Sequence, residues 1–255
     1  MSFPIERRIT GSEMPARYVV LEGLARLVGT YQTADQAKPG RKEELSAAVF
    51  NSVWDLQGPK TAYAAFTDGE KDVIHLFQCA GEVEESLEFL KDFEHYLRRF
   101  PFSKTRITKS RYLSHVVGTY LQEVYILENR LISMSEAIEL TCAGTNLEQT
   151  ASELAKKIRR YVKKALGTLR KARGMHVHHW RDSNDDIQGL IVLDLLANPL
   201  LKGDPDAKYC KERDRRFRKL RTKWVEITSQ TARDAESVVD QCFSWLIPLL
   251  FRSST

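Results

Sequence analysis

Apolar residues recur every three or four positions over most of the chain, with polar residues between them. The most regular run goes from Leu113 to Ile138, where steps of three and four alternate along a single stripe. This spacing places the apolar side chains on one face of an α-helix of about thirty residues. Ala143-Gly144 marks the predicted end of this helix, because glycine readily adopts the left-handed conformation that closes helices.

The same period returns after Gly144, so further helices are predicted there. Thr145 or Asn146 is placed to cap the first of them, and Asn198-Pro199 to end the second. No stretch shows the two-residue alternation of β-strands. The pattern therefore predicts an all-α bundle with two long antiparallel helices and shorter ones, the further stripes being residues 147–169, 187–195 and 217–249.

The part of the chain before residue 106 is predicted to be helical as well. Thr67 and Glu70 have the spacing of a capping box, so we expect them to begin a helix that continues to about residue 99 and is ended by Pro101. Shorter stripes predict two earlier helices, at 14–31 and 45–56. The polar stretch 103–110 then separates an N-terminal helical region, residues 1–105, from the bundle, residues 106–255.

Composition limits the classes that remain. Of the 255 residues, 42% are hydrophobic and 29% charged, with only 8 Pro and 13 Gly, which is typical of an ordered helical protein. The four cysteines include no C-x-x-C pair, so neither a zinc ribbon nor a disulfide framework is expected. No apolar run approaches the about 20 residues that span a bilayer. We therefore expect a cytoplasmic protein that does not engage the membrane.

Positive charge is concentrated in two windows. Residues 156–173 contain nine Lys or Arg among eighteen and no acid, and residues 208–223 contain nine among sixteen. Such clustering is the electrostatic footprint of a polyanion binder. The alternative interpretation is a solvated basic helix face. The sequence indicates these basic residues as the RNA contacts: Lys156, Lys157, Arg159, Arg160, Lys163, Lys164, Arg170, Lys171 and Arg181.

The first window ends in the segment Arg173-Gly174-Met175-His176-Val177-His178-His179-Trp180-Arg181, which holds three of the six histidines. A histidine titrates near neutrality and can exchange a proton with a ribose hydroxyl. An arginine stays charged and can bind phosphoryl oxygens with two N–H groups. The pair Arg173 and His178 therefore suits RNA cleavage. The alternative is that the cations only complement the end of a helix dipole.

Two features of this segment restrict its chemistry. In a continuous helix Arg173 and His178 would point about 140° apart, so convergence requires the helix to loosen at Gly174 or a second protomer to supply the partner group. His176 and His178 lie on different helix faces, and no carboxylate or cysteine follows at ligand spacing. We expect no metal site. Glycine-rich phosphate loops and serine-hydrolase motifs are also missing, so no cofactor is expected.

An arginine followed by four residues and a histidine, placed after two long helices, resembles the motif of the HEPN superfamily. The resemblance covers roughly the second half of the chain and implies a metal-independent endoribonuclease that acts as a homodimer. It implies Arg173 as the phosphate clamp and His178 as the general acid or base, with His176 and His179 as substitutes. Gly174 departs from the family pattern, in which a polar residue often follows the arginine.

The resemblance also implies a biological setting, that of a bacterial toxin or defence factor with a protein antitoxin as partner. The sequence leaves two alternatives open. One is a non-catalytic module that binds RNA or a protein through the windows 156–173 and 208–223. The other is an interaction protein whose helical stripes form an oligomer.

Overall fold

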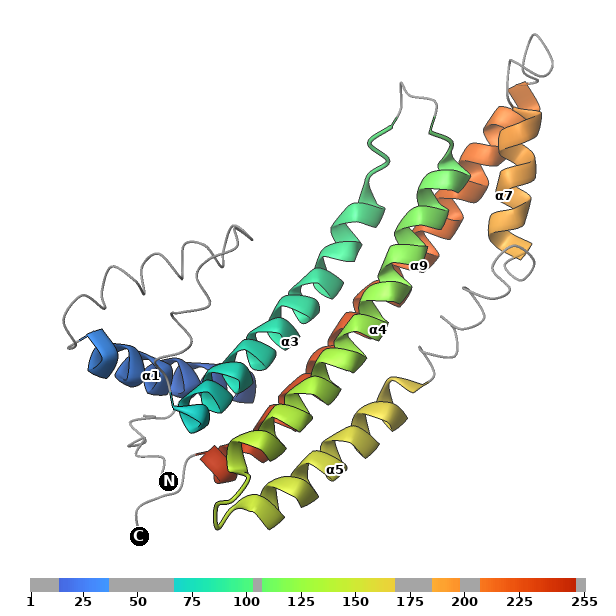
Figure 1. Cartoon of the computed structure of the whole chain (residues 1–255). Helices are drawn as coiled ribbons and strands as arrows, with labels where there is room; N and C mark the ends of the chain where they lie inside the picture. Colours follow the sequence, from blue (N-terminus) through green and yellow to red (C-terminus); the bar gives the residue numbers. More distant parts are fainter. Residues whose placement is uncertain (1–13, 37–66, 103–106, 168–184, 198–206, 251–255) are drawn as a thin grey trace. The chain divides into compact units, whose positions relative to one another are not determined.

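The computed structural model describes residues 14–36, 67–102, 107–167, 185–197 and 207–250. These residues form six helices and, within the described ranges, no strand: α1 (Ala16–Gln36), α3 (Asp68–Arg98), α4 (Lys109–Cys142), α5 (Glu148–Ala165), α7 (Asp185–Leu196) and α9 (Ala207–Leu250). The all-α prediction is confirmed (Figure 1). The predicted helix 45–56 and the Arg173–Arg181 segment lie outside the described residues.

Helix boundaries follow the local signals in the sequence. At the start of α3 the Thr67 amide donates to Glu70 Oε2 over 2.8 Å, and the Glu70 amide donates to Thr67 Oγ1 over 3.3 Å, which is the predicted capping box. After α4, Gly144 has a φ of 66°, in the left-handed region where glycine is favoured. The Thr145 hydroxyl accepts the Leu147 amide just before α5. The predicted end of α4 is therefore confirmed.

The chain divides into two compact units. Unit 1 comprises residues 1–83, 130–160 and 239–255, and unit 2 comprises residues 84–129 and 161–238. The expected boundary near residue 105 falls between α3 and α4, and both units take residues from either side of it. Helices α3, α4 and α9, which contain 31, 34 and 44 residues, each contribute residues to both units.

Unit 1 is built around the helical hairpin formed by the end of α4 and most of α5. Ser152 of α5 donates to Glu139 of α4 over 3.1 Å, and Arg159, later in α5, donates to Glu139 over 2.7 Å and to Ser135, earlier in α4, over 3.2 Å. The two helices are therefore antiparallel. Polar contacts tie the other segments to the unit: Thr141 to the Asp72 carbonyl, and Arg17 of α1 to Asp240 of α9. The core includes Leu24, Leu76, Leu131, Met134, Ile138, Ile158 and Phe243.

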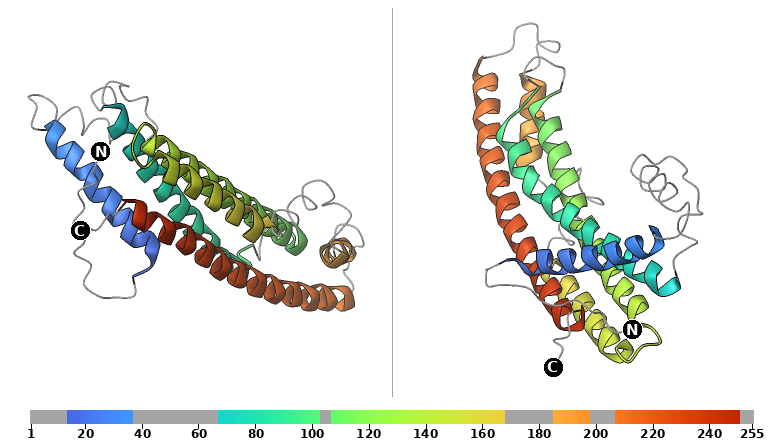
Figure 2. Two further views of the ribbon diagram at one scale, coloured as in Figure 1. Left: turned by 90° about the horizontal axis from the view of Figure 1, so that it is seen from below. Right: turned by 90° about the vertical axis from the view of Figure 1, so that its left-hand side faces the viewer.

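In unit 2 the remaining parts of α3, α4 and α9 run alongside one another (Figures 1 and 2). Lys91 of α3 bonds to Glu236 of α9 over 2.9 Å, and Ser229 of α9 donates to Glu94. The residue numbers of these partners rise along α3 and fall along α9, so the two helices are antiparallel. Fully buried side chains in this unit include Leu87, Leu90, Leu97, Leu113, Tyr120, Leu127 and Leu190.

Helix α7 packs beside the beginning of α9 and caps α4. Gly189 comes so close to α9 that an added Cβ would lie 2.5 Å from the Arg216 guanidinium carbon. The buried Asp194 carboxylate accepts the Ser110 amide over 2.8 Å, in the first turn of α4. An acidic side chain from a distant helix thus satisfies an amide that the first turn leaves without an intrahelical partner.

Candidate functional site

The predicted catalytic pair lies outside the part of the chain that the structure describes. Helix α5 ends at Ala165 and α7 begins at Asp185. Arg173, His178 and their substitutes His176 and His179 fall between those helices, as do the predicted RNA contacts Arg170, Lys171 and Arg181. The described structure therefore bears on six of the nine predicted RNA-binding residues.

Helix α5 is sharply two-faced. Ala151, Ala155, Ile158 and Val162 are fully buried, and Leu166, directly after the helix, is buried as well. The polar face carries five exposed cations: Lys156, Lys157, Arg160, Lys163 and Lys164. Straight-chain basic residues are good helix formers, and their charge is stabilised near a helix C-terminus, so the same residues that build α5 also make it cationic.

Arg159 has a different role from its neighbours. Its guanidinium bonds to Glu139 over 2.7 Å and to the Ser135 hydroxyl over 3.2 Å, and its side chain is only 23% exposed. The hydrogen bond to Arg159 lowers the pKa of Glu139 despite partial burial, and the same bond raises the pKa of Arg159. This side chain joins α5 to α4, so we leave it out of the proposed RNA contacts.

Lys157 also contacts the protein. Its Nζ lies 3.8 Å from the centre of the Trp245 ring in α9, within cation–π range. Lys157 as a whole nevertheless remains exposed to solvent. Lys157 can therefore reach a ligand only by giving up part of this contact, whereas Lys156, Arg160, Lys163 and Lys164 project from the exposed face.

The second basic window forms the first half of α9, in unit 2. Phe217 and Leu220 are buried, while Lys208, Lys211, Arg215, Arg218, Lys219 and Lys223 are exposed. Some of its charge is neutralised within the unit. Glu212 forms two hydrogen bonds with Arg215, and Asp214 binds Lys109 over 2.7 Å and Arg213 over 2.9 Å. Burial opposes ionisation of Asp214, but these two cations keep its pKa below the usual value.

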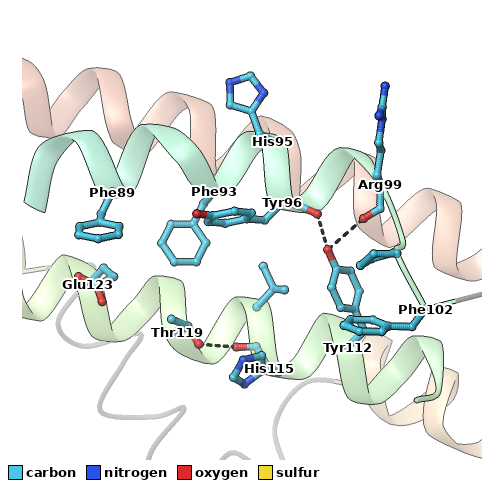
Figure 3. Close-up of a pocket in the computed structure, with 12 residues that line it drawn as sticks. Phe89, Phe93, His95, Tyr96, Arg99, Phe102, Tyr112, His115, Thr119 and Glu123 are labelled. Atoms are coloured by element: carbon cyan, nitrogen blue, oxygen red, sulfur yellow. Dashed lines mark hydrogen bonds between the residues drawn. The ribbon is translucent and has the colours of Figure 1, made fainter. Parts of the chain in front are cut away.

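The structure also contains a pocket in unit 2 that the sequence pattern did not predict. It has a volume of about 560 Å³ and lies between α3 and α4 (Figure 3). Phe89, Phe93 and Tyr96 line it from α3, at positions i, i+4 and i+7. Residues of α4 at the same spacing form the other wall: Tyr112, Val116, Thr119 and Glu123.

An aromatic cluster holds one end of this pocket. The Tyr112 hydroxyl donates to the carbonyl of Tyr96, in the last turn of α3, and to that of Arg99, which directly follows the helix. These carbonyls have no intrahelical partner, so the hydroxyl stabilises the end of the helix. The Tyr112 ring also packs edge-on against Phe100 and Phe102, with centroids 5.3 and 5.8 Å apart. Burial raises the pKa of Tyr112.

His95 and His115 lie at the rim of the pocket, and neither was assigned a role from the sequence. Both are exposed, and Figure 3 shows their rings directed away from the space between the helices. The sequence does contain a signal for the pocket, namely aromatic residues at positions 89, 93 and 96 on one side of a helix. An aromatic stripe of this kind is more often part of a buried core than of a pocket. Phe89 and Tyr96 are instead 46% and 50% exposed.

Neither a metal centre nor a membrane span is found in the part of the chain that the structure describes. No three His, Cys, Asp or Glu side chains of this part come together as a set of metal ligands. None of its helices combines the length and the apolar character needed to cross a bilayer.

The described residues form an all-α fold that carries strongly basic faces on α5 and α9 and an aromatic pocket between α3 and α4. Comparison with known proteins adds no family assignment, because no family model, no curated protein and no solved structure matches the chain.

Proposed function

We propose that the chain is a metal-independent endoribonuclease of the HEPN type, working as a homodimer. Its bound RNA would lie on the exposed cations of α5 and be cleaved by Arg173 and His178. The observation that carries this proposal is the charge distribution of α5: five exposed cations and no acid between Lys156 and Lys164, on a helix whose opposite face is buried. The motif follows on the same stretch of chain, with Arg173 eight positions after Ala165.

As a ligand for the cationic face of α5, the phosphate backbone of a nucleic acid is a better match than an acidic protein of fixed shape. Lys156, Arg160 and Lys163 succeed one another at steps of four and three, so they share one side of the helix. A row of mobile ammonium and guanidinium groups binds phosphates through charge, without reading sequence. The exposed cations of α9 supply a second such row in unit 2.

The proposed chemistry divides between two side chains. His178 takes the proton of the ribose 2′-hydroxyl as that oxygen attacks the adjacent phosphorus, or gives a proton to the leaving 5′-oxygen. Arg173 binds the phosphoryl oxygens as their charge grows in the transition state. In a homodimer each protomer contributes one such pair, so a second histidine is available for the opposite proton transfer.

A cleavage assay with purified protein tests the proposal. In EDTA the parent protein should cut single-stranded RNA, and His178→Ala should lower the rate by about 10² to 10⁴, which is the usual contribution of a general acid or base. Arg173→Ala should lower it as well. The matched control is His75→Ala, which removes an exposed histidine of α3. Equal rates for His178→Ala and the parent would show that the catalytic assignment is wrong.

A second candidate function is a module that binds RNA without cutting it. It is favoured by the fact that the exposed cations of α5 and α9 lie on described helices and do not depend on the motif. In that case neither the parent nor His178→Ala cleaves RNA, while both bind it with an affinity that falls steeply with salt. A role as a toxin or defence factor, with a protein antitoxin, belongs to the first proposal.

A further inference from the structure

The pocket between α3 and α4 has the size of a small-molecule site. Its volume of about 560 Å³ lies within the range of roughly 300–1,000 Å³ that is typical of ligand pockets. Two of its aromatic side chains, Phe89 and Tyr96, are each about half exposed although they belong to an otherwise well-packed bundle. Exposed aromatic rings that line a concavity indicate a binding surface.

The pocket walls are firmly supported. Phe93 packs edge-on against both Tyr96 and Tyr120, with ring centroids 5.7 and 5.4 Å apart. The two hydrogen bonds from Tyr112 fix the end of α3, and Tyr120 behind Phe93 is 1% exposed. The aromatic faces are thus held in position before any ligand arrives, which reduces the entropy lost on binding.

Charge inside the pocket is negative. Glu123 of α4 lies opposite Phe89 and is half-buried (Figure 3). Within the described residues its carboxylate has no hydrogen-bond or ion-pair partner. The basic side chains His95 and Arg99 of the lining are exposed, and Figure 3 shows them directed away from α4. His115 is exposed on the outer side of α4.

We propose that this pocket binds a small organic cation with an apolar body, such as a quaternary ammonium compound. Phe89, Phe93 and Tyr96 would present their electron-rich faces to the cation, and Glu123 would neutralise its charge. Aromatic rings attract cations through their quadrupole, and this attraction is the usual basis of quaternary ammonium recognition. The proposed site is independent of RNA binding and cleavage, because it uses none of the residues assigned to those functions.

Calorimetric titration of the whole 255-residue chain with three probes tests the proposal. The probes are the cation trimethylphenylammonium, its neutral isostere tert-butylbenzene, and the aromatic anion adenosine 5′-monophosphate. We expect the cation to bind about tenfold more tightly than the neutral probe, the combined effect of the rings and the carboxylate. The anion should bind more weakly than either.

Three variants assign the preference to the pocket. Glu123→Gln should weaken cation binding about fivefold and leave the neutral probe unaffected, because only the charge is removed. Phe89→Ala should weaken both the cation and the neutral probe. The control is Glu136→Gln, which removes an exposed carboxylate elsewhere on α4 and should change nothing. Circular dichroism melting shows whether each variant is folded.

Several results would overturn the proposal. Tighter binding of the nucleotide, with loss of binding in Arg99→Ala, would make the pocket a nucleobase site instead. Equal affinity for the cation and its neutral isostere would remove the role of Glu123 and of the ring faces. Absence of binding by all three probes would likewise contradict the proposal, since the pocket is already open and lined.

Discussion

Removing the exposed positive charge of α5 is the perturbation whose effect on RNA binding can be worked out most fully. The variant replaces Lys156, Arg160, Lys163 and Lys164 by glutamine. All four are exposed. The contacts that join α5 to neighbouring helices are the hydrogen bonds of Ser152 and Arg159 and the packing of Lys157 on Trp245, and Lys156 adds only a charge interaction with Glu139. Glutamine is nearly as good a helix former as lysine or arginine, so the helix should persist.

The expected loss follows from the number of phosphates that the four side chains can neutralise. For single-stranded nucleic acid each neutralised phosphate contributes about 0.7 to the slope of log K against log salt concentration. If every one of the four cations contacts a phosphate, the slope should fall by about 3. At about 0.1 M salt this corresponds to an affinity lower by up to about 10³-fold.

Fluorescence anisotropy with a labelled single-stranded RNA, titrated at four or five salt concentrations, measures both quantities. A matched variant removes four exposed cations from outside the basic windows, namely Arg26, Arg98, Arg111 and Arg233, and therefore has the same net charge. An unchanged slope in the α5 variant, or an equal loss in the matched variant, would refute the reasoning. An unchanged slope in the α5 variant would show that the RNA does not contact the α5 face. An equal loss in the matched variant would show that the overall charge of the protein governs binding.

Three further predictions concern buried or half-buried side chains of the two units, and each tests their effect on stability or their access to solvent. Asp194→Ala should lower the free energy of unfolding by about 1–3 kcal/mol in urea titration, because the buried Ser110 amide loses its acceptor; Asp194→Asn should cost less. Since Arg159 lowers the pKa of Glu139, that carboxylate stabilises the fold above its ordinary pKa of 4.5, and the parent should lose stability more steeply than Glu139→Gln as the pH falls below about 4.5. Burial raises the pKa of the Cys242 thiol from 9.0 to about 12. The stability that the neutral buried thiol contributes is therefore complete below pH 9 and is lost as the pH rises toward 12. Iodoacetamide at pH 8 should label Cys242 only in urea, which peptide mass spectrometry would show.

Sequence patterns predicted the features of the fold that depend on neighbours along the chain. The capping box of Thr67 and Glu70 and the turn at Gly144 depend on contacts within a few residues, and both were confirmed. The apolar stripe from Leu113 to Ile138 likewise predicted α4, because an apolar period of about 3.6 residues matches the number of residues in one helical turn. Local chemistry was sufficient at these positions.

Contacts between distant segments could not be predicted in this way. Asp194 was expected only as a member of a short helix, yet its carboxylate caps α4 from 84 positions away. Arg159 counted as one of nine similar cations until Glu139 was found beside it. Which of several equivalent side chains pairs with a given carboxylate depends on how the helices pack, and composition does not contain that information.

The candidate sites show the same division. Periodicity separated the buried face of α5 from its cationic face, because that separation lies within one helix. The aromatic pocket requires α3 and α4 to be placed side by side, and Glu123 acquires its importance only from lying opposite Phe89. The pair Arg173 and His178 lies outside the described residues, so its assignment still depends on the sequence motif.

The central claim is that Arg173 and His178 cleave RNA through the ribose 2′-hydroxyl without a metal. The most direct measurement is mass spectrometry of the products formed by the parent protein in EDTA. The proposed mechanism predicts fragments that end in a 2′,3′-cyclic phosphate, and no cleavage of the same oligonucleotide made with 2′-deoxyribose. Equal cleavage of the deoxy substrate, products with free 3′-hydroxyl ends, or intact RNA would contradict it.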